Sequence, residues 1–163
     1  MIIYNVPGRT GSNIEAKTTL ALAGHGRIVA VKEASGNLAQ IMDVIRDAPA
    51  GFQVLSGDDA LTLAVMVAGG TGIISVVSNM VPKRMSRLAE RCAAGDFSAA
   101  RAEQNALVPL MGVAFVESNP IPAKAGMAMM GKMENVVRLP LVPLDEKHAP
   151  LMREALKAAG ALA

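Results

Sequence analysis

The sequence contains few aromatic residues and no run of positive charge. Its 163 residues include no tryptophan, one tyrosine and three phenylalanines, and the net charge is only +2. The lysines and arginines are scattered along the chain. Nucleic-acid-binding domains need clustered basic residues and often aromatic rings that stack on bases. We therefore expect no nucleic-acid partner.

Cysteine and long apolar runs are also scarce. Cys92 is the only cysteine, which excludes an internal disulfide and suits a reducing compartment. The apolar run around residues 60–68 is well short of the ~20 residues that span a bilayer. The opening MIIYNV is too short for a signal peptide and lacks its basic start. We therefore expect no membrane association and a cytoplasmic location.

The sequence is rich in short apolar segments, with 52% hydrophobic and only 18% charged residues, which is enough for a real core. Four of these segments are continuous runs of Val- and Ile-rich sequence and do not alternate with polar residues, as is typical of parallel strands covered on both faces. The predicted strands are Ile2–Val6, Ile28–Val31, Phe52–Leu55 and Ile73–Val77.

Helical patterns follow each of these runs. The predicted helices are Asn13–Ala23, Leu38–Ala48, Asp59–Ala68 and Lys83–Ala94, and after them Asp96–Val116, Ile121–Met130 and Glu146–Ala159. The pattern therefore predicts four strand-helix units in residues 1–95 and a helical extension in residues 96–163.

Successive strand-helix units predict an α/β fold with a parallel sheet and right-handed crossovers. Two architectures fit: an open doubly wound sheet, and part of a (β/α)8 barrel. A complete barrel needs ~250 residues, so a barrel sequence of this length contains only half of one. Periodicity leaves both alternatives open.

A polar or glycine-rich segment marks the end of each predicted strand. These segments are YNVPGRTG from Tyr4, KEASGN from Lys32, SGDD from Ser56 and SVVSN from Ser75. Ligands bind at the carboxyl ends of parallel strands, so we expect the four segments to converge on one site.

Lys32 is the most informative residue of this set, because it closes an apolar strand. Burial disfavours the charged form of a lysine, and a neutral amine attacks carbonyl compounds to form a Schiff base. Two structural alternatives remain open at this point: an ion pair with Glu33, and extension of the ammonium into solvent.

Tyr4 and Arg9 are candidates of the same kind. The phenol of Tyr4 can relay protons during imine formation, although many strand tyrosines only pack a ring. Arg9 is predicted to lie in a Pro-Gly loop, where a guanidinium either binds a substrate carboxylate or is simply solvated.

Other motifs give no sign of a cofactor. GGTGII, at residues 69–74, lacks the third glycine of a dinucleotide fingerprint and precedes a strand. No cluster of Cys or His suggests a metal, and His25 and His148 are expected at the surface. Asp58 and Asp59 are interpreted as helix caps rather than as an acid and base pair. We therefore predict no cofactor and no metal.

Taken together, YNVPGRTG, VKEASGNL, LSGDDAL, GGTGIISVVSN and ESNPIPAK closely resemble the dihydrodipicolinate synthase family, in its order and spacing. The resemblance covers the family's second half and implies half of an eight-stranded α/β barrel with a C-terminal helical extension. It leaves open a truncated gene product, a fragment or a mis-called start.

The resemblance also implies roles for individual residues. Lys32 is similar to the lysine that forms a Schiff base with pyruvate, and Tyr4 to the proton-relay tyrosine. Arg9 resembles the arginine that receives the carboxylate of aspartate semialdehyde, and Ile74 the residue whose main chain faces pyruvate. Gly57, in SGDD, is predicted to be a further substrate-binding residue. The implied partners are these two small molecules and, as a homo-oligomer, other copies of the chain.

The family's first half supplies a Thr-Thr pair, a second tyrosine and a lysine feedback site, and this sequence has none of them. Thr18 and Thr19 are adjacent but do not match the family's pair. A non-catalytic half-barrel remnant therefore remains as an alternative. A relative of N-acetylneuraminate lyase is another, because sister families of that type share a lysine of this kind. Because a half barrel exposes two strand edges, we expect the chain either to self-associate or to be unstable.

Overall fold

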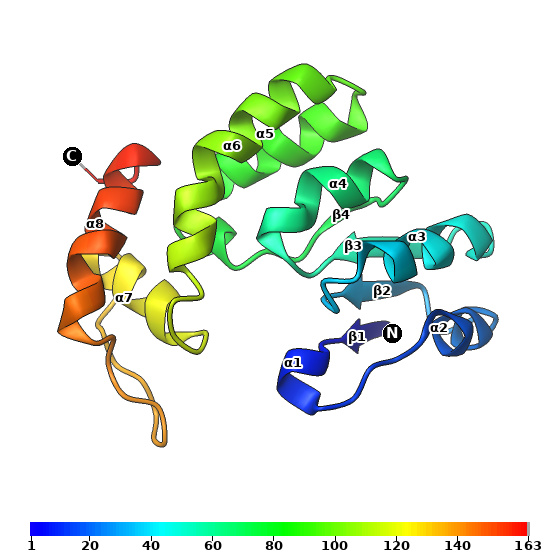
Figure 1. Ribbon diagram of the computed structural model, residues 1–163, viewed down its shortest axis with the longest axis horizontal. Helices are drawn as coiled ribbons and strands as arrows, with labels where there is room; N and C mark the ends of the chain where they lie inside the picture. Colours follow the sequence, from blue (N-terminus) through cyan, green and yellow to red (C-terminus); the bar gives the residue numbers. More distant parts are fainter. Residues whose placement is uncertain (163) are drawn as a thin grey trace.

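Four parallel strands form one sheet in the computed structural model, which describes residues 1–162 (Figure 1). The strands are β1 (Ile2–Asn5), β2 (Ala30–Glu33), β3 (Gln53–Ser56) and β4 (Gly72–Ile73), paired in the order β1-β2-β3-β4. Every neighbouring pair is parallel, and at least one helix separates consecutive strands in the chain. The predicted series of parallel strand-helix units is therefore confirmed.

The helices fall into two groups. Those following the strands are α1 (Pro7–Thr10), α2 (Ala16–Ala23), α3 (Leu38–Asp47), η1 (Asp59–Leu61), α4 (Thr62–Val67), η2 (Val77–Asn79) and α5 (Pro82–Ala93). The C-terminal ones are α6 (Phe97–Val113), α7 (Ile121–Met129), η3 (Glu146–His148) and α8 (Ala149–Ala158). No helix within residues 1–162 has the length and apolar character needed to cross a bilayer. The division at residue 95 stays a prediction.

The strands point towards the end of the molecule that carries α7 and α8, whereas α2 and α3 lie at the opposite end (Figure 1). The carboxyl ends of the strands therefore face the start of α7. This arrangement brings residues from both groups of helices to one edge of the sheet.

Three local predictions were wrong. The second strand begins at Ala30 and includes Lys32 and Glu33, because these polar residues continue the backbone pairing with β1. The fourth strand has only two residues, since the chain after Ile74 turns into η2. Arg9 lies in the one-turn helix α1 and not in a loop, and the Val6 carbonyl accepts from its backbone N–H at 2.9 Å.

One face of the sheet is packed against helices. Val31 and Val54 point to this face, where they contact α3 and α4 in an apolar cluster. The fully buried members of α3 and α4 are Ile41, Val44 and Val65. Each such side chain contributes roughly 1.5–3 kcal/mol through removal of its surface from water. A larger cluster joins α5, α6 and α8 around Leu88, Leu107 and Leu156.

The other face of the sheet is open. Residues paired in register point to the same side, so Tyr4, Lys32 and Leu55 share the face opposite to the helix cluster. Ile2 is 50% exposed and Tyr4 47% exposed on this side. Within the part of the chain that the structure describes, no further strand pairs with β1 or β4.

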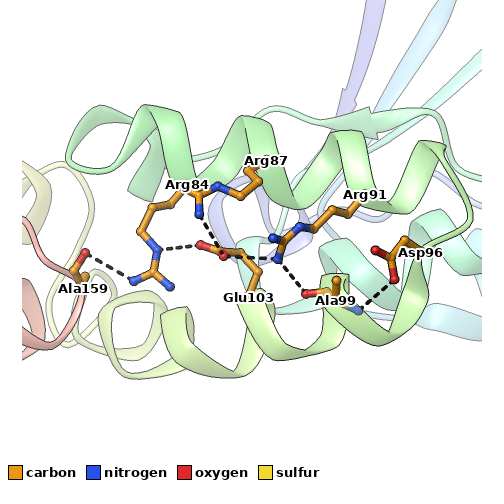
Figure 2. Close-up of polar contacts among 7 residues, drawn as sticks. All are labelled: Arg84, Arg87, Arg91, Asp96, Ala99, Glu103 and Ala159. Atoms are coloured by element: carbon orange, nitrogen blue, oxygen red, sulfur yellow. Dashed lines mark hydrogen bonds and ion pairs between the residues drawn. The ribbon is translucent and has the colours of Figure 1, made fainter.

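A charged cluster connects the three long helices beyond the sheet (Figure 2). Glu103 of α6 is 7% exposed and receives a 2.5 Å hydrogen bond from Nε of Arg84 on α5. Arg84 also donates to the carbonyl of Ala159, just after α8, at 3.3 Å. Arg91 lies 3.6 Å and Arg87 3.9 Å from the same carboxylate. Glu103 therefore ties α5, α6 and the end of α8 together.

We predict that Glu103→Ala lowers the free energy of unfolding by about 2–3 kcal/mol, because it leaves the half-buried Arg84 without its carboxylate. Arg87→Ala serves as the control, since this half-exposed arginine contributes about 0–1 kcal/mol. Urea unfolding followed by circular dichroism gives both values. Equal losses in the two variants would contradict the central position of Glu103.

Candidate active site

Tyr4 and Lys32 are direct neighbours across β1 and β2. Their Cα atoms are register partners, and the Lys32 Nζ lies 4.1 Å from the centroid of the Tyr4 ring. The alternative in which Lys32 pairs with Glu33 is wrong, because the Glu33 side chain points to the helix-covered face of the sheet. Among residues 1–162, no carboxylate forms an ion pair with Lys32. The only tyrosine of the chain thus contacts the amine predicted to react.

A cleft of about 380 Å³ opens beside this pair. It brings together four of the five predicted site residues, namely Tyr4, Arg9, Lys32 and Gly57. A second cleft of about 350 Å³ reaches Lys32 from the side of α7 and is lined by Ser75, Asn79, Asn119 and Lys124, among others. The amine of Lys32 therefore lies where two clefts meet.

Arg9 lies at the rim of the first cleft. Its Nη2 donates to the Asn119 carbonyl at 3.1 Å, which links α1 to the segment that precedes α7. A guanidinium has five N–H donors, so this bond leaves most of them for a ligand. The protein therefore orients Arg9 and leaves its other N–H groups able to bind a carboxylate.

Ile74 follows β4 directly, whereas the sequence predicted it inside the fourth strand, and it lines neither of the two clefts. Its N–H donates to the Ser56 carbonyl at 2.9 Å and so extends the ladder between β3 and β4. The adjacent Val76 lines both clefts. The structure therefore brings the segment after β4 to the site, with Ile74 at its start.

Asp59 is a buried residue that sequence reasoning misinterpreted as a cap. Its carboxylate accepts from the Ser75 hydroxyl and from the backbone N–H groups of Val76, at 2.9 Å, and Val77, at 3.2 Å. Burial raises the pKa of the Asp59 carboxyl above its ordinary value, and these three hydrogen bonds oppose the rise. Asp59 therefore fixes the wall of the clefts, whereas Asp58 caps η1 through Ala60, as predicted.

Sequence reasoning missed Asn5 and considered Glu33 only as an ion-pair partner of Lys32. They follow Tyr4 and Lys32 directly, and each is 1% exposed on the helix-covered face. Nothing in a single sequence distinguishes them from ordinary strand-end polar residues.

Metal-binding geometry is not found among the described residues, where no three His, Cys, Asp or Glu side chains gather. His25 is exposed, as predicted, whereas His148 is half-buried with its Nε2 3.8 Å from Glu117. Neither histidine lines the two clefts. That the protein needs no cofactor stays a prediction.

Gly57 leaves space for the side chain of Lys32. A Cβ atom at this position would lie 2.6 Å from the Cβ of Ala34 and 3.1 Å from the Cγ of Lys32. Real Cβ atoms do not approach so closely, so any side chain at residue 57 would displace the stem of Lys32 or its strand. Gly57 therefore acts on the amine by leaving space for it.

We predict that Gly57→Ala lowers the free energy of unfolding by about 1–3 kcal/mol, because the added methyl group overpacks this contact. Gly8→Ala is the matched control, since a Cβ at residue 8 would meet nothing within 4 Å. Urea unfolding of both variants checks the difference. If Gly57→Ala were as stable as Gly8→Ala, the close packing of residue 57 against Lys32 would be wrong.

Comparison with known proteins places these features in a family. The model of the dihydrodipicolinate synthetase family matches residues 1–159. The chain is 48% identical over 162 residues to the 4-hydroxy-tetrahydrodipicolinate synthase of Koribacter versatilis and 49% identical over 160 residues to that of Maridesulfovibrio salexigens. These matches cover 99% and 98% of this chain but 54% and 55% of the relatives, so the chain spans about half the length of the curated relatives it matches.

Solved structures of the same family also superpose on this chain. The dihydrodipicolinate synthase of Thermotoga maritima superposes with a TM-score of 0.96 at 43% identity, covering 99% of this chain and 56% of that one. The chloride-inhibited enzyme of Acinetobacter baumannii in complex with pyruvate gives 0.96 at 38% identity, covering 99% and 55%. These relatives are barrel enzymes, so the half-barrel architecture is confirmed over the open doubly wound sheet. The chain belongs to the dihydrodipicolinate synthetase family.

Proposed function

We propose that this chain carries the imine-forming half of a lyase site that condenses pyruvate with L-aspartate 4-semialdehyde, in the route to diaminopimelate and lysine. The observation that carries the proposal is the 4.1 Å contact between the Lys32 amine and the Tyr4 ring. The names of its relatives, 4-hydroxy-tetrahydrodipicolinate synthases, and the solved complex of one neighbour with pyruvate support the choice of reaction.

The first step forms a covalent bond to Lys32. Its neutral amine attacks the keto carbon of pyruvate, the carbonyl oxygen leaves as water, and a protonated imine remains. We assign the passage of protons to and from the intermediate to the phenol of Tyr4, whose ring lies beside the amine. The cationic imine then accepts the electron pair of a methyl C–H bond, and the loss of that proton gives a nucleophilic enamine.

The second step uses the rim of the cleft. The enamine attacks the aldehyde carbon of the semialdehyde, whose carboxylate binds the guanidinium of Arg9. The substrate's amino group then displaces Lys32 from the imine and closes the ring. In this proposal Gly57 and Ile74 bind pyruvate through their main-chain groups, at the ends of β3 and β4.

A second function is a non-catalytic half barrel that keeps the family's residues without turnover. The lack, within the given sequence, of the Thr-Thr pair and the second tyrosine that the resemblance implies favours it. A pyruvate-dependent aldolase of the N-acetylneuraminate lyase type is a third function. The segments VPGRTG and SGDD favour the synthase over that type.

We further propose that the chain acts as a homo-oligomer and in the cytoplasm. Its accessible surface is 8717 Å², whereas a folded monomer of 16.9 kDa has roughly 7,700 Å². The excess is close to the roughly 800 Å² that each partner buries in a standard interface. The open face of the sheet and its two free edges supply such a surface. The cytoplasmic location rests on Cys92, the only thiol.

We predict that pyruvate followed by borohydride labels Lys32, and peptide mass spectrometry locates the adduct. Lys32→Ala should abolish labelling, and Tyr4→Phe should slow it by about a hundredfold because it removes the proton relay. Lys83→Ala, an exposed lysine on α5, is the control and should label normally. If Lys32 is labelled but no condensation product forms, the result supports the non-catalytic half barrel. If the protein is folded and Lys32 is not labelled, the proposal is overturned.

We predict, from the open face, that the chain sediments as an oligomer and that Ile2→Glu shifts it towards monomer or causes aggregation. Leu151→Glu on α8 is the matched control, since both side chains are 50% exposed. Sedimentation velocity over a concentration series measures the change. A stable, monodisperse wild-type monomer contradicts the proposal.

A further inference from the structure

Glu33 is a buried carboxylate whose partners are all neutral. It is 1% exposed, and its two oxygens accept from Asn5 Nδ2 at 3.0 and 3.1 Å, from Ser35 N at 2.7 Å and from Gln40 Nε2 at 3.3 Å. Within the described residues no cation lies within ion-pair distance of it. Burying an unpaired charge is costly unless hydrogen bonds satisfy it, so these bonds are what hold Glu33 in place.

The partner across the sheet is Asn5, which is also 1% exposed. Asn5 and Glu33 are register partners on the rung directly after the one that joins Tyr4 and Lys32. Its Oδ1 accepts from the backbone N–H of Ile14 at 3.0 Å, so the same side chain anchors the segment that leads into α2. One polar network thus joins the end of β1, the end of β2 and the chain before α2.

The two rungs occupy opposite faces of the same two strands, because side chains alternate along a strand. On the open face Tyr4 is 47% exposed and has little packing to fix it. β1 is also an edge strand of four residues, held by β2 alone within residues 1–162. The restraint on the relative position of Tyr4 and Lys32 therefore comes from the covered face.

We propose that Asn5 and Glu33 form a positioning pair, which sets the distance between Tyr4 and Lys32 from the reverse side of the sheet. The inference rests on the proposed function for its chemical consequence, while its geometric content is independent of that function. The pair touches no substrate and acts only through the two strand residues that precede it.

The positioning pair needs both acceptor oxygens of the Glu33 carboxylate, and a side chain of the same size is not enough. Oε1 accepts from Asn5 and Ser35, and Oε2 accepts from Asn5 and Gln40, so both oxygens face donors. A glutamine has one oxygen and one NH₂ group, and either orientation sets that NH₂ against at least one donor. Glu33→Gln therefore weakens the pair at almost constant volume.

The test compares Glu33→Gln and Asn5→Ala with Leu107→Ala, a core substitution in the separate cluster of α5, α6 and α8. Because Tyr4 is the only tyrosine, its ring signals are unambiguous in NMR spectra. We expect a nuclear Overhauser effect between the Tyr4 ring and the Lys32 ε-methylene in the wild type and in Leu107→Ala. We expect it to weaken or vanish in the two positioning variants.

The second measurement is the rate of pyruvate trapping at Lys32 by borohydride, normalised to the folded fraction and followed against pyruvate concentration. Displacing reacting groups by about 1 Å costs about a hundredfold in rate, so we expect ten- to a hundredfold slower trapping at saturating pyruvate. Leu107→Ala should trap at the wild-type rate per folded molecule. Trapping that is equally slow in Leu107→Ala would mean a merely structural role and overturn the inference.

The outcomes separate the two proposals. A wild type that is not labelled by pyruvate refutes the proposed function, while the Tyr4–Lys32 contact in the spectra still decides the inference. Should Asn5→Ala fail to fold, Glu33→Gln decides alone. A folded Glu33→Gln with the wild-type contact between Tyr4 and Lys32 overturns the positioning pair.

Discussion

The register between β1 and β2 is the constraint on which the rest of the site depends. Side chains alternate between the faces of a strand, so a shift of one residue would exchange every side chain between core and site. Such a shift in β2 would place Glu33 on the open face and Lys32 among the helices. In the observed register Lys32 stands beside Tyr4 and Glu33 beside Asn5. One alignment of two strands thus determines both which side chains meet at the candidate site and which pack against the helices.

Three buried carboxylates hold the molecule together, each with a different kind of partner. Glu33 receives hydrogen bonds from neutral donors, Asp59 from a hydroxyl and two backbone N–H groups, and Glu103 from arginines. Only Glu103 is far along the chain from the predicted catalytic segments, and it alone has cationic partners. Glu33 and Asp59 belong to the segments that carry predicted site residues, and neutral donors alone satisfy them there.

The sequence predicted what depends on local pattern. Continuous apolar runs predicted four parallel strands, and the rule that such strands share a carboxyl edge was enough to group Tyr4, Lys32 and Gly57 in one site. Residue roles came from the resemblance to the family. Asp59 and Glu33 were misinterpreted or missed because their partners lie on other elements: Val76 follows β4, and Asn5 ends β1. Single-sequence patterns carry no information about such contacts, and they also misplaced the start of β2, whose limits are set by pairing with β1.

The open face carries the candidate site and is covered only in part. Residues of α6 and α7 line the clefts beside Lys32, but Tyr4 is 47% exposed and Lys32 is half-buried, so water reaches both. Water stabilises an ammonium, and the proposed attack on pyruvate needs the neutral amine. Covering this face with protein would remove that stabilisation and exclude water from the proposed imine. Burial of this one surface would therefore both stabilise the sheet and favour the proposed chemistry.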